Sequence, residues 1–165
     1  MTSQRRRKRR PRQVKFKTYN IIKWILSPLL LPWCIMQNLV GVGVWIYSKF
    51  RGYCKRVKTD EGFVYYEVDN NNPCYAVSLG YFVFLQQIYN SDNITHHHEY
   101  GHELQSMLLG PLYLILIGLP SGLSNVFDWA KGSDITYYNY PWEKWADYWG
   151  GVKHKNLWYD RRLDA

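Results

Sequence analysis

An uncharged segment of 25 residues, Trp24 to Ser48, limits the possible folds of this chain more than any other part of it. A helix of this length can cross the hydrocarbon core of a bilayer, and uncharged runs this long are rare in soluble domains. Lysines and arginines flank both ends, and Trp24, Trp33 and Trp45 suit the membrane–water interface. The sequence therefore predicts a membrane-spanning or re-entrant helical segment over residues 20–50.

The sequence is compatible with two paths of this segment, a single span across the membrane or a re-entrant hairpin. Polar amides lie near its middle at Gln37 and Asn38, and helix-breaking residues occur at Pro28, Pro32, Gly41 and Gly43. These residues disfavour a single straight span and make a re-entrant hairpin the alternative. Positive charge on both flanks fits the hairpin slightly better, because both ends then lie on one side of the membrane.

Charge divides the chain into a basic front and a mildly acidic body. Residues 1–59 carry 15 Lys or Arg and no Asp or Glu, whereas residues 60–165 sum to −7, which gives the net charge of +8. Residues 1–19 are expected to form a basic, disordered arm. Because an apolar segment follows, the arm is best interpreted as a contact with anionic membrane lipid. Nucleic-acid binding is the weaker interpretation of the same charge.

Residues 60–152 are predicted to form a small α+β domain, followed by a polar tail over 153–165. Gly62–Val68 and Cys74–Leu85 are rich in β-branched and aromatic residues, and Asp69–Pro73 between them is a turn sequence. This pattern predicts a β-hairpin. Gly80, inside the second run, is expected to mark a bulge or a close approach of the backbone.

Two helices are expected after the hairpin. The first begins at Ser91, Asp92 or Asn93 and ends near Leu109, because Gly110-Pro111 follows. The second lies within Tyr140–Val152, with Pro141 near its start and Gly150-Gly151 at its end. Between them runs the uncharged stretch Leu108–Phe127, which is interpreted equally well as a membrane-surface or re-entrant segment and as part of the core.

The first of these helices carries the motif His-Glu-x-x-His at His98, Glu99 and His102. Residues four apart share a helix face, so both imidazoles can point at one metal ion. The carboxylate of Glu99 is then placed to accept a proton from a metal-bound water. Gly101, between the two histidines, allows a neighbouring segment to approach closely. The three cysteines lack C-x-x-C spacing, which does not indicate a thiolate metal site.

A third metal ligand is predicted on the second helix. Glu143 and Asp147 are four residues apart and share a face. Glu143 can complete a His₂Glu zinc site, and Asp147 can accept a hydrogen bond from the outer nitrogen of a ligand histidine. His96 and His97 lie on other faces of the motif helix and are expected to be exposed or to contact the ligands from outside.

This pair of motifs, HEYGH followed by ExxxD, resembles the gluzincin class of zinc metallopeptidases. The resemblance covers roughly residues 75–150 and implies His98, His102 and Glu143 as zinc ligands, Glu99 as general base and Asp147 as the partner of a ligand. It extends to small bacterial membrane-associated proteins, which implies a bacterial inner-membrane location. It also implies that Ala76–Phe84 is an edge strand that pairs with an extended peptide or protein substrate.

Two functions follow as hypotheses. The first is a membrane-associated zinc metallopeptidase that hydrolyses peptide bonds with zinc-activated water. The second is a membrane-anchored, non-catalytic binding or scaffold protein with a structural zinc site. No residue is clearly marked as the stabiliser of the oxyanion that peptide hydrolysis requires; the candidates are Tyr137, Tyr138, Tyr140 and His154.

Overall fold

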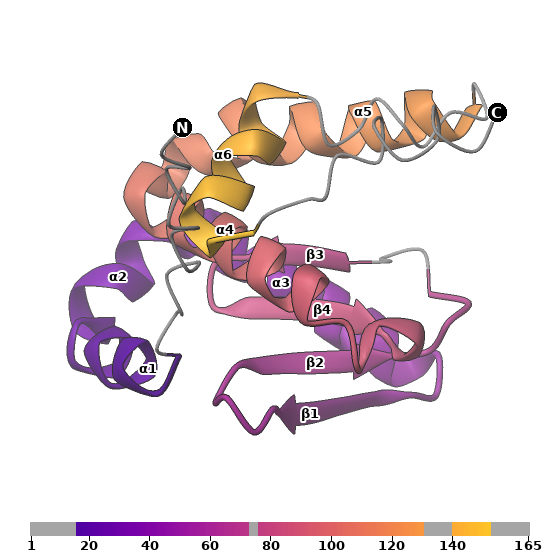
Figure 1. Cartoon of the computed structure of the whole chain (residues 1–165), viewed down its shortest axis with the longest axis horizontal. Helices are drawn as coiled ribbons and strands as arrows, with labels where there is room; N and C mark the ends of the chain where they lie inside the picture. The colour runs from indigo at the N-terminus through magenta and orange to yellow at the C-terminus, as the bar shows by residue number, and fades with distance from the viewer. Residues whose placement is uncertain (1–15, 73–75, 131–139, 153–165) are drawn as a thin grey trace, which may run out of the picture.

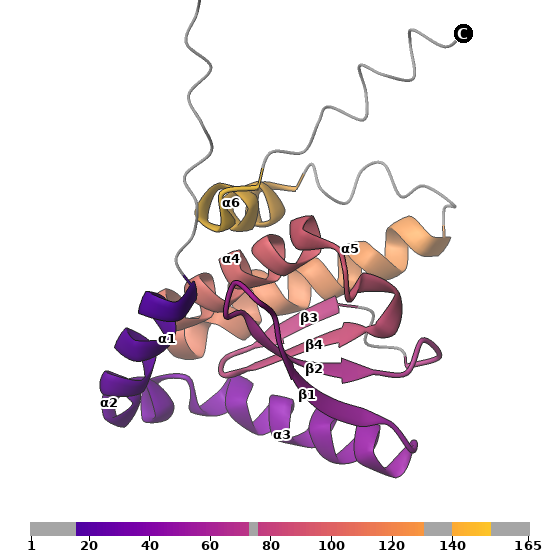
Figure 2. The same ribbon diagram turned by 60° about the horizontal axis from the view of Figure 1, so that its bottom comes forward.

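The computed structural model describes residues 16–72, 76–130 and 140–152, which form a layered α+β fold (Figure 1). A four-stranded mixed sheet lies between α3 (Ile35–Phe50) on one face and α4 (Asn93–Leu109) on the other. Figure 2 shows α6 (Pro141–Gly150) packed on the outer side of α4. The helix that carries the motif is therefore covered on two sides. The α+β class predicted from the sequence is confirmed.

The sheet has the strand order β1-β2-β4-β3. Its strands are β1 (Cys54–Lys58), β2 (Val64–Val68), β3 (Ala76–Leu79) and β4 (Phe82–Gln86). β1 runs antiparallel to β2, β2 runs parallel to β4, and β3 runs antiparallel to β4. β1 and β3 are thus the two edges, and β1 carries exposed Lys and Arg side chains, which discourage pairing with another chain.

The predicted hairpin between 62–68 and 74–85 is wrong. A turn does form after β2, where the Asn72 amide donates to the Asp69 carbonyl over 2.9 Å, but the chain then passes to the far edge of the sheet. The hairpin instead joins β3 to β4, and Leu79 pairs with Phe82 around a two-residue turn. Gly80 supplies the positive φ (65°) that such a turn needs. It is also a point of close approach, because a Cβ there would lie 2.3 Å from Asn38 Oδ1.

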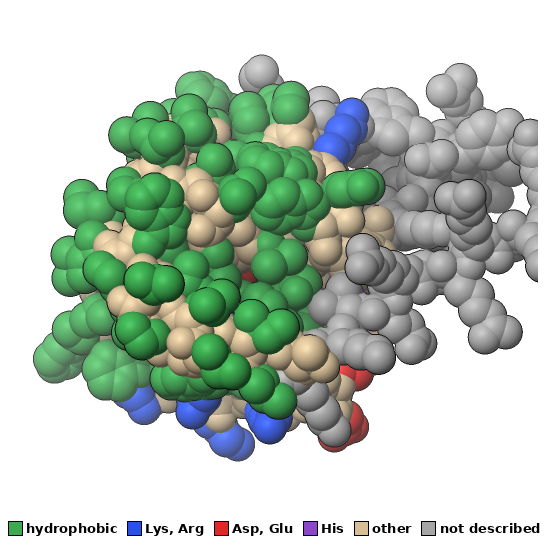
Figure 3. Space-filling model, turned by 90° about the vertical axis from the view of Figure 1, so that its left-hand side faces the viewer, with side chains coloured by type: hydrophobic (Ala, Val, Ile, Leu, Met, Phe, Trp, Pro, Cys, Tyr) green, Lys and Arg blue, Asp and Glu red, His purple; other side chains and the backbone are tan. Residues whose placement is uncertain are grey.

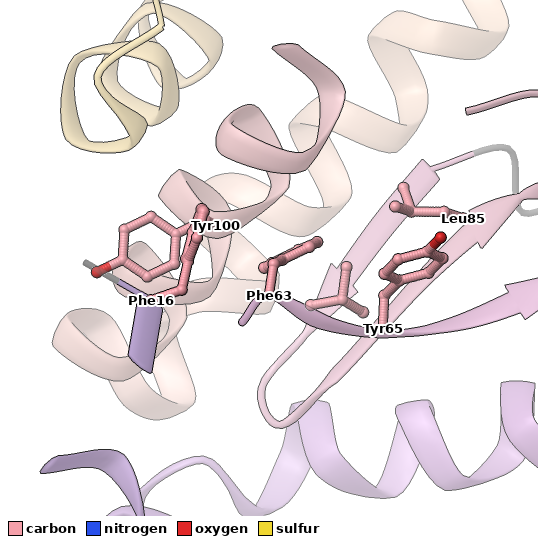
Figure 4. Packing of buried hydrophobic residues seen from close by; sticks show 6 residues of the cluster. Phe16, Phe63, Tyr65, Leu85 and Tyr100 are labelled. Atoms are coloured by element: carbon pink, nitrogen blue, oxygen red, sulfur yellow. The ribbon is translucent and has the colours of Figure 1, made fainter. Parts of the chain in front are cut away.

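Alternation along β4 divides the core into two clusters. Val83 and Leu85 face α4 in a cluster that also contains Tyr65, Phe63 and Tyr100 (Figure 4). Phe82 and Phe84 belong to the other cluster, with Val68 and Val44 of α3. A strand with apolar residues on both faces is expected inside a sheet that helices cover on both sides. This packing fixes α4, and with it the motif, against the sheet.

The N-terminal segment forms three helices, α1 (Phe16–Ile25), α2 (Ser27–Trp33) and α3. The uncharged run is thus divided at Cys34, where α2 and α3 meet at a bend of 82°. Among the described residues, no single helix has both the length and the apolar character needed to cross a membrane. Two bent pairs of helices meet those criteria only when taken together, the second being Asn93–Leu112 with Leu114–Ser124, bent by 118°.

The polar amides of this segment hold it to the rest of the fold. Gln37 Nε2 donates to the Gly110 carbonyl over 2.7 Å, at the end of α4. The Asn38 Oδ1 atom accepts from the Tyr81 amide over 2.9 Å, in the β3–β4 turn. Both side chains are buried. Their role is to satisfy backbone groups at the helix end and the turn, which the sequence alone did not reveal.

Two details of α1 differ from the expectation of a free basic arm with flanking lysines. Helical structure begins at Phe16, which is buried against Phe63 and Tyr100, so residues 16–19 belong to the fold; residues 1–15 lie outside the described part. Lys23 is partly buried, and it forms an ion pair with Glu103 of α4. Lys23 therefore ties α1 to the motif helix and is not available to lipid headgroups.

The remaining elements follow the predicted punctuation closely. α4 begins after Asp92, whose side chain accepts a hydrogen bond from the Ile94 amide over 3.0 Å, and it ends at Gly110. The apolar stretch after it forms short helical turns, η2 (Gly110–Leu112) and η3 (Leu114–Gly118), and then α5 (Leu119–Ala130). α6 begins after Tyr140 and ends at Gly150, and the next residue, Gly151, has a left-handed backbone conformation that caps the helix. A single-turn helix, η1 (Gln87–Tyr89), precedes α4.

Candidate metal centre

Two glycines allow α4 and α6 to cross at backbone distance. A Cβ on Gly101 of α4 would lie 1.9 Å from the carbonyl oxygen of Ala146, and a Cβ on Gly150 of α6 would lie 2.0 Å from that of His97. No other residue fits at either position without separating the helices. The predicted close approach at Gly101 is confirmed, and the approaching segment is the ExxxD helix itself.

The crossing brings the three predicted ligands together. His102 Nε2 lies 3.2 Å from His98 Nε2 and 3.0 Å from Glu143 Oε2, and His98 Nε2 lies 3.1 Å from the same carboxylate oxygen. All three side chains are buried. The group can hold a metal ion, with one ligand atom offered by each residue.

The hydrogen bonds of the two outer ring nitrogens show which atoms meet at the centre of the group. When both rings are neutral, His98 Nε2, His102 Nε2 and Glu143 Oε2 are all acceptors. His98 Nδ1 lies 2.7 Å from Asp147 Oδ1, and an ionised carboxylate can only accept, so Nδ1 carries the proton. His102 Nδ1 lies 2.8 Å from Gln105 Oε1, and the Gln105 amide nitrogen donates to the Trp142 carbonyl over 2.9 Å, which fixes that amide's orientation. In neutral rings both Nε2 atoms then present lone pairs to each other and to Glu143. Only a positive charge between them makes this arrangement favourable.

The electrostatics of the buried group favour such a charge. Burial opposes a charged ring at His98, but its hydrogen bonds with Asp147 and Glu143 outweigh this and raise its pKa to about 10. Burial also opposes charge on Glu143, but its contacts with His102 and His98 lower its pKa. Without a metal ion the group therefore favours a protonated His98 beside an ionised Glu143, and a metal ion would have to displace that proton.

Glu99 is buried beside the three ligands without serving as one. Its Oε2 atom has no hydrogen-bond partner among the described residues, which is costly for a carboxylate. Burial raises its pKa, and the charges of His102 and His98 counteract this in part. An orphaned carboxylate oxygen adjacent to a candidate metal group is an unused proton acceptor.

The other sequence candidates are dispersed. His96 is buried against the rings of Phe63 and Tyr65, so the expectation that it is exposed or contacts the ligands is wrong; burial lowers its pKa. His97 is half-buried, and its Nδ1 lies 2.9 Å from the Gly150 carbonyl. Tyr140 stacks on Trp142 at the start of α6. Tyr137, Tyr138 and His154 lie outside the described residues.

Three residues near the site were not predicted from the sequence. Gln105 lies one turn after His102, and this spacing is the signal that could have identified it. Ser121 of α5 donates from Oγ to Glu143 Oε1 over 2.6 Å, and nothing in the apolar stretch marks it. Tyr113 is buried, and its hydroxyl donates to the Ser78 carbonyl of β3 over 3.0 Å. Burial raises the pKa of Tyr113, and the charges of Glu99 and Glu143 raise it further.

The hydrogen bond of Asp147 to His98 gives a first testable prediction. Asp147→Asn keeps the shape of the side chain but removes the charge that holds the ring, so affinity for a divalent metal ion should fall about 10- to 100-fold. Competition with a metal-sensing chelator measures this. Asp92→Asn is the control, because Asn caps a helix as well as Asp does, and its affinity should equal that of the wild type. Equal affinities in all three proteins would contradict the role given to Asp147.

Comparisons of the chain with protein-family models, with curated proteins and with solved structures give no match.

Proposed function

We propose that this protein is a membrane-associated zinc hydrolase that cleaves peptide bonds, with Glu99 as the general base. The observation that carries the proposal is the convergence of His98 Nε2, His102 Nε2 and Glu143 Oε2 within 3.2 Å, beside the unpaired carboxylate oxygen of Glu99. In a tetrahedral zinc site with bonds of about 2.0–2.1 Å, ligand atoms lie about 3.3 Å apart. The observed spacings are close to that value.

The chain's own residues divide the work. His98, His102 and Glu143 would hold the ion, while Asp147, Gln105 and Ser121 fix the orientation of these ligands through the hydrogen bonds described above. A bound zinc ion would act as a Lewis acid and lower the pKa of a water molecule. Glu99 would accept the proton of that water and deliver it to the leaving amine. Burial raises the pKa of Glu99, which favours its holding the proton until the leaving amine accepts it.

Two features favour catalysis over a structural zinc site. The metal group contains three residues among those described, and three protein ligands with one open position are typical of catalytic zinc, whereas structural sites usually have four. The second feature is Glu99 itself. A structural site gains nothing from a buried carboxylate without a partner, which only costs stability.

The edge strand β3 is the proposed recognition element for an extended peptide. The expected edge strand Ala76–Phe84 is divided by the turn at Gly80, and only its first part, Ala76–Leu79, lies at a sheet edge, because β4 is an inner strand. One of the carbonyls of β3, that of Ser78, already accepts from the Tyr113 hydroxyl. A substrate strand added to β3 would therefore compete with Tyr113 at this position, which connects substrate pairing to a side chain whose pKa is influenced by Glu99 and Glu143.

Metal removal tests the proposed function. The full-length protein in detergent should lose all cleavage of an unfolded, casein-like substrate after dialysis against a strong chelator, and one equivalent of zinc should restore it. His102→Asn should bind no stoichiometric zinc and remain inactive after zinc addition. His97→Asn is the matched control and should bind zinc like the wild type. Cleavage that persists in the metal-free protein would overturn the proposal.

A further inference from the structure

The stretch from Leu108 to Phe127 has one face that is buried in the protein and one face that is exposed and apolar. Tyr113, Ile117 and Ser124 are buried, and Ser121 contacts the metal ligand Glu143, so these positions form an inner face. The opposite face is apolar and 50–63% exposed, at Leu112, Ile115, Leu116, Leu119, Leu123, Val126 and Phe127. No charged residue occurs between Leu108 and Phe127. A helix face in contact with water normally carries charged or polar residues, and this one has none.

This outer face continues onto the N-terminal helices. α1 and α2 expose Ile22, Trp24, Ile25 and Leu29, and α3 exposes Leu39. α2 packs against the end of α4 and the start of η2. Trp33 Nε1 donates to the Met107 carbonyl of α4 over 3.0 Å, and the Trp33 ring lies against Gly110 of η2. Figure 3 shows a broad, largely hydrophobic surface on the side of the molecule where α1 and α2 lie in Figure 1. We name the exposed apolar side chains of α1, α2, α3, η2, η3 and α5 the apolar face. Contiguous exposed apolar surfaces of this kind mark sites of protein or membrane interaction.

The charges around the apolar face identify what covers it. Lys and Arg side chains line its lower border in Figure 3. Exposed basic residues occur from the last turn of α3 to the end of β1, at Lys49, Arg51, Lys55, Arg56 and Lys58. No acidic residue precedes Asp60 in the chain. An apolar surface bordered by cations fits a bilayer with anionic headgroups, where the side chains enter the acyl region and the cations meet phosphate. A second copy of this chain would bring like charges together at the same border.

We infer that the apolar face inserts into one leaflet of an anionic membrane, and that the metal centre beneath α5 acts on polypeptides held at that membrane surface. The part that concerns substrates rests on the proposed function. Its basis is the contact between Ser121 and Glu143, which places the metal ligand directly under a helix whose outer face is in lipid.

Vesicle flotation of the full-length protein tests the surface without any need for activity. Wild type should float with phosphatidylcholine vesicles that contain about one third phosphatidylglycerol, and more weakly with phosphatidylcholine alone. Ile115→Glu, on the apolar face, should weaken membrane binding about 10- to 100-fold, because it removes one isoleucine side chain that would be buried in the acyl region of the bilayer. Ile88→Glu is the matched control. Ile88 is 60% exposed and Ile115 is 63% exposed, so the two substitutions are comparable. Ile88 lies in η1, directly after β4, and the end of β4 points away from α2 in Figure 1.

Cleavage then separates the two proposals. On anionic vesicles, a reporter peptide attached to a membrane anchor should be cleaved at least about tenfold faster than the same peptide in solution, because both partners share one surface. Ile115→Glu should abolish this difference and keep cleavage of the soluble peptide. No flotation, or a soluble dimer of the chain with equal cleavage of both peptides, would overturn the inference and leave the hydrolase standing. Flotation that Ile115→Glu weakens, with no cleavage of either peptide, would support the surface and overturn the hydrolase.

Discussion

Replacement of Glu99 by Gln should leave zinc binding intact and lower kcat about 10²- to 10⁴-fold. Glutamine has the same size and fits the same buried position, but its amide cannot accept the proton of the attacking water. His98, His102 and Glu143 remain in place, so the stoichiometry of bound metal should equal that of the wild type. Metal analysis and cleavage of an unfolded substrate by the two proteins, measured in parallel, give both quantities.

The same replacement should raise the thermal stability of the metal-free protein. Burial raises the pKa of Glu99, which means that the folded state disfavours the ionised carboxylate. A neutral amide removes this cost at neutral pH, so the melting temperature of Glu99→Gln should exceed that of the wild type. Gain of stability with loss of activity is the pattern expected of a functional residue kept at a cost to the fold.

Glu61→Gln is the control for both measurements. The Glu61 side chain is 55% exposed and contacts His97, which lies next to the first ligand but is not one. It should behave as the wild type in cleavage and in metal content. Retained cleavage in Glu99→Gln would refute the assignment of the base. Loss of zinc in Glu99→Gln would instead show that Glu99 is a ligand.

The candidate metal centre was predictable because local rules determine most of its geometry. A helical repeat places His98 and His102 on one face, and the same rule pairs Glu143 with Asp147. Capping residues at Asp92, Gly110 and Gly151 determine where the two helices begin and end. These features depend on residues within one or two turns of each other, which a single sequence displays directly.

The sheet was harder to predict because its order depends on contacts between distant segments. β1 was missed because Lys55, Arg56 and Lys58 give it the composition of a loop, although such residues protect an edge strand. The turn after β2 was recognised, but a turn sequence does not say which strand the chain joins next. The parallel pairing of β2 with β4 therefore left no local signal.

The supporting contacts of the metal centre were missed for the same reason. Ser121 lies 22 residues before Glu143 in the chain and reaches it only because the fold brings α5 next to this side chain of α6. Lys23 was interpreted as a flanking cation, yet it pairs with Glu103, 80 residues away. The sequence thus predicted which residues converge in the candidate metal centre, whereas the residues that position them became visible only in the fold.

The crossing of α4 and α6 leads to the second large prediction, that Gly101→Ala destroys the metal centre. The added methyl group would meet the backbone oxygen of Ala146 at 1.9 Å, and a backbone atom cannot rotate away as a side chain can. The helices must separate, at a cost of about 3 kcal/mol or more. For a chain of this size the melting temperature should fall by at least about 6 °C. Stoichiometric zinc binding should be lost, because Glu143 and the two histidines lie on opposite helices.

Gly43→Ala is the matched control for this substitution. Gly43 lies in α3, where a Cβ would meet nothing within 4 Å, so alanine should be neutral or stabilise the protein by about 0.5–1 kcal/mol. Gly150→Ala adds an independent check from the other helix, because its Cβ would lie 2.0 Å from the His97 carbonyl. It should reproduce the effects of Gly101→Ala. Normal zinc binding in either crossing variant would show that the ligands do not depend on this contact between α4 and α6.

Circular dichroism of Gly101→Ala distinguishes a lost site from a lost fold. α4 also packs against the sheet through Tyr100, and Lys23 holds it to α1 through Glu103, so α4 should stay helical when α6 separates. Most of the helical signal should therefore remain while zinc binding disappears. This outcome would show that the metal centre is assembled by docking of α6, and that the two glycines at the crossing are as necessary for metal binding as the ligands themselves.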